Sequence, residues 1–233
     1  MSTENFGLAD LTNSIFNSLS VAGTTDTLLL GQSQMRECLI LIDGMGQDAF
    51  DKYADQFPVL ESLKLVEKLN ANFPSTTATS LSTLGTGVLP GVHGMLGYTV
   101  RVPRSDNRLL NALKWDERVD PVIWQKVPTL FERAAAAGVA VSHVAAKRYE
   151  ASGFTQAALR GARYIGANGV DEMATAVALA LKPQPSFVYT YLNTLDAAGH
   201  SDGVGSDKWL TALAQIAEFV TKVKELVPSG TRI

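Results

Sequence analysis

The stretch CLILIDGMG, residues 38–46, carries the strongest fold signal in the chain. Its first five residues, Cys38 to Ile42, are all apolar, and Asp43 and Gly44 follow directly. A short unbroken apolar run that ends in turn residues is typical of a strand buried on both faces, as strands of parallel sheets are. The stretch therefore predicts a strand of a parallel sheet, with a carboxylate at its carboxyl end.

The segments that follow alternate between helices and strands. Residues 127–146 predict a helix that stops at Gly138 and a strand over Val139–Val144. Residues 170–183 predict a second helix, ended by a proline, and residues 186–193 (SFVYTYLN) predict a strand rich in aromatic and β-branched residues. Strands alternating with helices predict a three-layer α/β/α sandwich with a mostly parallel central sheet.

The clearest helix signal lies in residues 206–230. Ser206 is the expected N-cap, and Pro228 with Gly230 marks the end. Apolar residues recur between these points at intervals of three and four, the spacing of one helical face: Trp209, Leu213, Ile216, Val220, Val223 and Val227.

Two segments do not fit the alternation. Residues 97–115 have a polar centre between two apolar arms, which predicts a hairpin or excursion near the site. Residues 1–30 leave two alternatives open, a helix that packs on the sheet or a flexible arm.

The composition is that of an ordinary soluble globular protein, and we expect a single domain over residues 1–233. Hydrophobic residues make up 46% of the chain and charged residues 18%. The net charge of -3 argues against a broad nucleic-acid-binding surface. No signal peptide or membrane-spanning run is recognisable, so we expect a cytoplasmic protein without membrane contact. The single cysteine, Cys38, is expected to be a buried, inert thiol.

Asp43 is the first candidate for chemistry, because ligands of open parallel sheets bind beyond the carboxyl ends of the strands. The alternative is a turn residue, since Asp-Gly pairs favour tight turns.

Asp196 and His200, in LDAAGHSDG (residues 195–203), form the second candidate group. They are four residues apart and lie on one face if the segment is helical. A carboxylate with an imidazole suits zinc or a similar divalent ion. The alternative is a polar loop with a hydrogen-bonded histidine.

The third candidate is NFPSTTATSLSTLGTG, residues 72–87, which is unusually rich in hydroxyl groups. A short helix is expected to run to about Leu84, and a helix N-terminus attracts phosphate through its N–H groups and dipole. The alternative is a simple cap and turn. The hydroxyl residues that precede or begin this helix are Thr76, Thr77, Thr79 and Ser80.

Taken together in chain order, these motifs are far more specific than any one alone. They are LIDGMG, then FPSTTATSLSTLGTGVLPGVHGM, then YTYLNTLDAAGH. This order resembles the alkaline phosphatase superfamily, and within it the nucleotide pyrophosphatase/phosphodiesterase branch and its bacterial relatives. The resemblance runs from about residue 35 to the end of the chain.

The resemblance implies two divalent metal ions, usually zinc, on either side of a hydroxyl nucleophile. Asp43 then matches a ligand of one ion, and Asp196 and His200 match ligands of the other. Thr77 matches the nucleophile, which also touches the first ion. Ser80 falls where the phosphodiesterase branch often has an asparagine that steadies a phosphate oxygen.

Three other residues are weighed against these positions. Thr76 is the rival nucleophile, but the spacing from Pro74 favours Thr77. His93 fits the family pattern, and we interpret it as structural. His143 is expected to be a packed histidine with a satisfied ring nitrogen.

The implied function is metal-dependent hydrolysis of small-molecule phosphate esters, with phosphodiester or nucleotide pyrophosphate bonds favoured and a phosphothreonine intermediate. One alternative within the superfamily is a phosphomonoesterase or phosphonate hydrolase, for which Arg101, Arg104 and Arg108 offer positive charge. The other alternative is a non-catalytic domain that keeps the fold and lacks a full metal site.

The family completes its metal sites with an Asp-His pair and a further histidine, all late in the chain. This sequence has three histidines, none of them after His200, and it ends in VPSGTRI, which predicts a helix stop and the start of a strand. The sequence therefore predicts a domain truncated at its C-terminus. We expect the 233-residue chain to bind metal weakly and to be poorly active.

Overall fold

The computed structural model describes residues 6–32, 35–63 and 68–233. The chain divides into two compact units, each assembled from segments that are distant in sequence. The first unit comprises Met1–Ser33, Glu67–Val141 and Arg148–Arg163. The second unit comprises Gln34–Val66, Ser142–Lys147 and Tyr164–Ile233.

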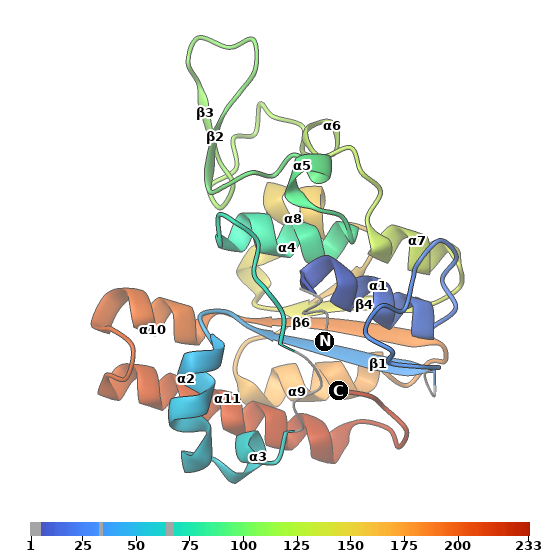
Figure 1. Cartoon of the computed structure of the whole chain (residues 1–233), viewed down its shortest axis with the longest axis vertical. Helices are drawn as coiled ribbons and strands as arrows, with labels where there is room; N and C mark the ends of the chain where they lie inside the picture. Colours follow the sequence, from blue (N-terminus) through green and yellow to red (C-terminus); the bar gives the residue numbers. More distant parts are fainter. Residues whose placement is uncertain (1–5, 33–34, 64–67) are drawn as a thin grey trace, which may run out of the picture. The chain divides into compact units, whose positions relative to one another are not determined.

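A four-stranded sheet with the strand order β1-β6-β4-β5 forms the centre of the fold. β1 and β6 pair in parallel from Arg36 opposite Ser186 to Ile42 opposite Leu192, and Figure 1 shows them side by side. The strands predicted over residues 38–42, 139–144 and 186–193 are confirmed. The strands are β1 (Arg36–Ile42), β4 (Ala140–Ala145), β5 (Arg163–Gly166) and β6 (Ser186–Leu192).

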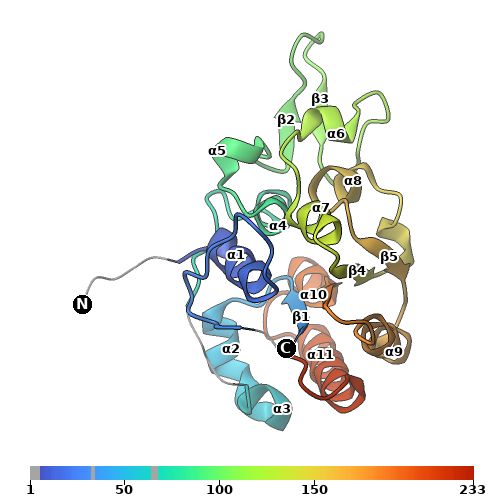
Figure 2. The same cartoon turned by 90° about the vertical axis from the view of Figure 1, so that its right-hand side faces the viewer.

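Helices of the second unit cover one face of this sheet. Side chains from alternate positions of β1 and β6, among them Cys38 and Val188, join a core with side chains of α9 and α11. These two helices lie side by side in Figure 2. The helices of this unit are α2 (Gln47–Tyr53), η1 (Ala54–Gln56), α3 (Pro58–Glu61), α9 (Val170–Ala180), α10 (Thr194–Asp202) and α11 (Asp207–Leu226).

The long helix α11 confirms its sequence prediction. Ser206 is the N-cap, and its side chain accepts a hydrogen bond from the backbone N–H of Trp209. Five of the six apolar residues predicted for the inner face are buried, and Val227 packs at the margin of the same core. Cys38 is buried as expected, and burial raises the pKa of its thiol to about 12.

The first unit contains helices and a hairpin. α1 packs against α4 and α7, with the rings of Phe16 and Phe131 6.0 Å apart, so residues 8–18 form a packed helix. The predicted hairpin is confirmed as β2 (Thr99–Arg101) paired antiparallel with β3 (Leu109–Asn111). The helices are α1 (Leu8–Ser18), α4 (Thr77–Thr86), α5 (Pro90–His93), α6 (Pro121–Trp124), α7 (Leu130–Ala136) and α8 (Gly153–Ala158), and η2 (Lys147–Tyr149) lies where the units alternate along the chain.

His143 on β4 is buried, but the prediction of a satisfied ring nitrogen is wrong. Among the described residues neither of its ring nitrogens has a hydrogen-bond partner. The strand turns the imidazole onto a sheet face between the rings of Tyr164 and Tyr189, at centroid distances of 4.7 Å and 4.9 Å. Aromatic neighbours from the flanking strands thus take the place of polar ones. Burial lowers the pKa of His143 to about 3.

Because His143 is buried, we expect the free energy of unfolding to fall in mild acid. The folded state keeps His143 neutral, whereas the unfolded chain takes up a proton below a pKa of 6.5. The unfolding free energy that comes from keeping His143 neutral is therefore fully present above pH 6.5. It is lost progressively as the pH falls from 6.5 toward 3. Between pH 7 and pH 5 this one group costs about 2 kcal/mol of unfolding free energy.

Guanidinium unfolding at both pH values measures the effect, with His143→Phe as the comparison. The variant should lose less stability than the wild type on acidification, by about 2 kcal/mol. Equal losses in the two proteins would contradict the assignment.

Candidate active site

The end of the β1–β6 pair brings together residues that are far apart in sequence. The backbone N–H of Asp43, directly after β1, donates to the carbonyl oxygen of Leu192, the last residue of β6, at 2.9 Å. Asp196 lies four residues beyond Leu192, in the first turn of α10. The parallel pairing therefore leads two candidate carboxylates to the same edge of the sheet. Figure 1 shows β1 and β6 side by side up to this edge.

Gly44 sets how closely these two segments approach. Its φ is +78°, a backbone conformation that residues other than glycine rarely adopt. A Cβ atom added at Gly44 would lie 2.8 Å from the Cα and 3.0 Å from the backbone nitrogen of Asp196. The Asp-Gly pair after β1 is thus a tight turn, and this turn also packs against the start of α10.

Asp196 and His200 lie on one face of α10, as predicted. The Nε2 atom of His200 is 3.5 Å from Oδ1 of Asp196, and the imidazole is largely exposed. Partial burial raises the pKa of Asp196, the negative charge of Asp43 raises it further, and His200 opposes the shift. The strand edge therefore concentrates negative charge, with an imidazole at its solvent side.

Tyr191 is a site residue to which the sequence analysis assigned no role. Its phenol donates a 2.6 Å hydrogen bond to Oδ2 of Asp43, from the strand that pairs with β1. The signal was present in the alternation of SFVYTYLN, which puts Tyr191 on the sheet face opposite to Leu192. The parallel register with β1 was needed to reveal its partner.

Thr77 is the first residue of α4, on the first unit. Thr76 is the N-cap, with its side-chain oxygen accepting from the backbone N–H of Thr79 at 3.4 Å and lying 3.0 Å from the Thr79 hydroxyl. Ser80 follows in the first turn, half-buried, and its backbone N–H donates to the Thr76 carbonyl. The helix prediction is confirmed, although α4 continues two residues beyond Leu84.

A buried polar network surrounds Thr83 of α4. The Thr83 hydroxyl donates to the Thr79 carbonyl and accepts a 2.6 Å hydrogen bond from the Asn72 amide. The Nδ1 atom of His93 accepts from the backbone N–H of Met95, so the other nitrogen carries the proton toward Thr83, 3.0 Å away. The structural interpretation of His93 is confirmed, and burial keeps this imidazole neutral by lowering its pKa to about 4.

The arginines considered for extra phosphate charge lie on the hairpin. Arg108 is 3.7 Å from the carboxylate of Asp116, which also takes hydrogen bonds from Arg118. These contacts, led by the Arg118 hydrogen bond, hold the pKa of Asp116 at about 2. Arg101 and Arg104 are exposed.

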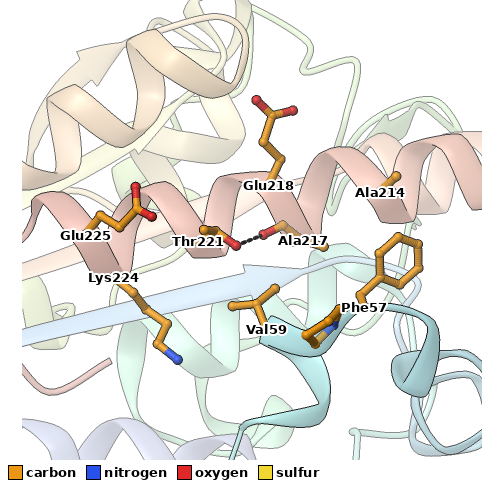
Figure 3. Close-up of a pocket in the computed structure, with 9 residues that line it drawn as sticks. Phe57, Val59, Ala214, Ala217, Glu218, Thr221, Lys224 and Glu225 are labelled. Atoms are coloured by element: carbon orange, nitrogen blue, oxygen red, sulfur yellow. Dashed lines mark hydrogen bonds between the residues drawn. The ribbon is translucent and has the colours of Figure 1, made fainter.

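A groove of about 650 Å³ lies elsewhere on the second unit, between α3 and α11. Figure 3 shows Phe57 and Val59 on one side and the helix face with Thr221 on the other. The Thr221 hydroxyl donates to the carbonyl of Ala217 within the helix. None of the candidate site residues lines this groove.

Comparison with known proteins identifies the family. The family model described as Type I phosphodiesterase / nucleotide pyrophosphatase matches residues 38–231. The chain belongs to this family. No curated protein sequence matched the chain.

A solved structure supports the same fold. Phosphonoacetate hydrolase from Sinorhizobium meliloti 1021, crystallised in complex with phosphonoformate, superposes with a TM-score of 0.54 at 16% sequence identity. The match covers 82% of this chain and 53% of that chain, so the chain spans about half the length of this neighbour. The likeness confirms the predicted alkaline phosphatase-like α/β fold.

The predicted site residues of this phosphodiesterase-family chain fall into two groups. The second unit brings Asp43, Asp196 and His200 to one sheet edge, whereas Thr77 and Ser80 lie together on the first unit. Carboxylate and imidazole donors, with like charges close together, fit a divalent cation. Within residues 6–32, 35–63 and 68–233, however, no group of three or more His, Cys, Asp or Glu side chains is arranged to hold a metal ion. None of the helices in these ranges combines the length and hydropathy needed to cross a membrane.

The contact at Gly44 predicts a matched pair of variants. Gly44→Ala should lower the free energy of unfolding by about 1–3 kcal/mol, because the new methyl group meets backbone atoms of Asp196. Gly91→Ala, at an exposed position of α5, should leave the free energy of unfolding unchanged or raise it slightly, because nothing lies within 4 Å of an added Cβ and alanine favours a helix over glycine. Urea denaturation measures both. If the two variants are equally stable, the close approach of the turn to α10 is wrong.

Proposed function

We propose that the protein hydrolyses small-molecule phosphate esters, with phosphodiester or nucleotide pyrophosphate bonds preferred, within one catalytic domain over residues 1–233. The observation that carries the proposal is the sheet edge where Asp43 meets Asp196 and His200, in a chain that belongs to the Type I phosphodiesterase / nucleotide pyrophosphatase family. Members of this family are generally metal-dependent.

The cations are proposed to be two divalent ions, zinc by preference. Asp43 would hold one, and Asp196 with His200 would hold the other. The family resemblance is the ground for proposing Thr77 as a further ligand of the first ion. The raised pKa of Asp196, caused by partial burial and then by Asp43, supports a place for positive charge. Divalent ions, when bound, stabilise negative charge as Lewis acids and lower the pKa of a nearby hydroxyl group.

Thr77 is proposed as the nucleophile. Its Oγ atom attacks phosphorus and forms a P–O bond while the bond to the leaving oxygen breaks, and the threonine proton passes to solvent. Water then attacks the phosphothreonine, the bond between phosphorus and Oγ breaks, and the hydroxyl is restored. The backbone N–H groups at the start of α4 would donate to a phosphate bound there, and the helix dipole would favour its charge.

The local structure supports Thr77 over Thr76. The Thr76 hydroxyl acts as the N-cap of α4, whereas Thr77 begins the helix itself. Ser80, one turn later, is proposed to steady a phosphate oxygen in place of the asparagine found in the phosphodiesterase branch.

A phosphonate is the second candidate substrate class. The observation that favours it is the structural likeness to phosphonoacetate hydrolase. Release of inorganic phosphate from a phosphonate, compared with nitrophenol release from a nitrophenyl phosphodiester, separates the two activities.

Replacement of the two threonines tests the nucleophile. Thr77→Ala should reduce hydrolysis of bis-nitrophenyl phosphate to the uncatalysed background, because no hydroxyl remains to form the intermediate. Thr76→Ala should keep the reaction and lose about 1 kcal/mol of stability, because only the cap is removed.

Acid quenching followed by peptide mass spectrometry tests the intermediate even where turnover is slow. Because one nitrophenolate leaves bis-nitrophenyl phosphate in the first step, the expected product is a nitrophenyl phosphate group esterified to Thr77. The same group on Thr76, or full activity in Thr77→Ala, would show that the proposed nucleophile is wrong.

A further inference from the structure

The hydrogen bond between Tyr191 and Asp43 joins a tyrosine of one strand to a candidate metal ligand of another. The Oη atom of Tyr191 lies 2.6 Å from Oδ2 of Asp43. This distance is typical of a charge-assisted bond from a hydroxyl group to an ionised carboxylate. Asp43 is therefore held by a side chain in addition to its backbone bond to Leu192.

The register of the sheet brings the two side chains together. Tyr191 pairs with Leu41 across β1 and β6, so the two side chains project from the same face of the sheet. Asp43 is two residues beyond Leu41 and returns to that face. A tyrosine is long enough to span this diagonal, and its phenol oxygen meets the carboxylate.

The bond restricts a side chain that its position leaves otherwise adjustable. Asp43 is half-buried and is followed by Gly44, at the tight turn beside Asp196. A carboxylate has about four lone-pair sites, so one phenol bond fixes its plane and still allows it to bind a cation. Hydrogen bonds to ligating carboxylates are a general means of orienting them.

We propose that Tyr191 is a positioning residue, which orients the Asp43 carboxylate for a divalent cation by donating its phenol hydrogen to Oδ2. The inference rests on the proposed function, in which Asp43 is a ligand. Tyr191 acts in this role through Asp43, and its contribution is the preorganised direction of one carboxylate.

Tyr191→Phe removes one oxygen atom and retains the ring. Tyr189→Phe is the matched control, because it makes the same change two residues earlier on the same face of β6, at a side chain that lies against His143. Asp43→Asn removes the carboxylate itself and reports whether Asp43 binds a cation at all.

Titration of the 233-residue chain with Co²⁺, followed by its visible absorption spectrum, measures affinity and ligand geometry together. Tyr191→Phe should raise the dissociation constant about tenfold or more and shift the Co²⁺ band. Tyr189→Phe should preserve both the band and the affinity. Without Co²⁺, the thermal unfolding midpoint of Tyr191→Phe should fall by only a few degrees, because one hydrogen bond is lost and the fold is retained.

Two results would overturn the positioning role of Tyr191 and leave the proposed function standing. One is a Tyr191→Phe variant that binds Co²⁺ like the wild type while Asp43→Asn does not. The other is an equal loss of affinity in Tyr189→Phe, which would indicate general damage to β6. Absence of Co²⁺ binding in the wild type, or unchanged binding in Asp43→Asn, would overturn the proposed function as well.

Discussion

The parallel pairing of β1 with β6 is the constraint on which the candidate site depends. Seven residue pairs, from Arg36–Ser186 to Ile42–Leu192, align the two strands so that both end at the same edge. Because parallel strands share a direction, the residues that follow them emerge together, and Asp43 comes to lie beside the segment that carries Asp196. A shift of one residue in register would turn Tyr191 to the opposite face and break its bond to Asp43.

This arrangement places like charges close together in a partly buried setting. The pKa of Asp196 is raised by burial and by Asp43, which means that folding alone disfavours its ionised form. Proteins keep such unfavourable arrangements mainly where they serve a function. The tight turn at Gly44 and the Tyr191 bond show how the fold holds the two carboxylates in place despite their mutual repulsion.

The hydroxyl-rich helix α4 is buried, so its hydroxyl groups need hydrogen-bond partners. Ser82 and Thr86 donate back to carbonyl groups of their own helix, and Thr83 joins the network of Asn72 and His93. These bonds satisfy buried hydroxyl groups without larger side chains, so α4 can pack tightly. A Cβ atom at Gly85 would lie 1.9 Å from the carbonyl oxygen of Ala158 in α8. Most hydroxyl groups of residues 72–87 thus have a structural role. The candidates for a nucleophile are those in the first turn of α4.

The sequence by itself determined the features that depend on local order along the chain. Apolar runs and three-to-four spacing located β1, β6 and α11, and the spacing of Asp196 and His200 placed both on one helical face, because these signals come from the period of a strand or helix. Only the tertiary structure decided the partner of Tyr191, the contact between Gly44 and Asp196, and the aromatic surroundings of His143. Those depend on strand register and on packing between distant segments, which no local period encodes.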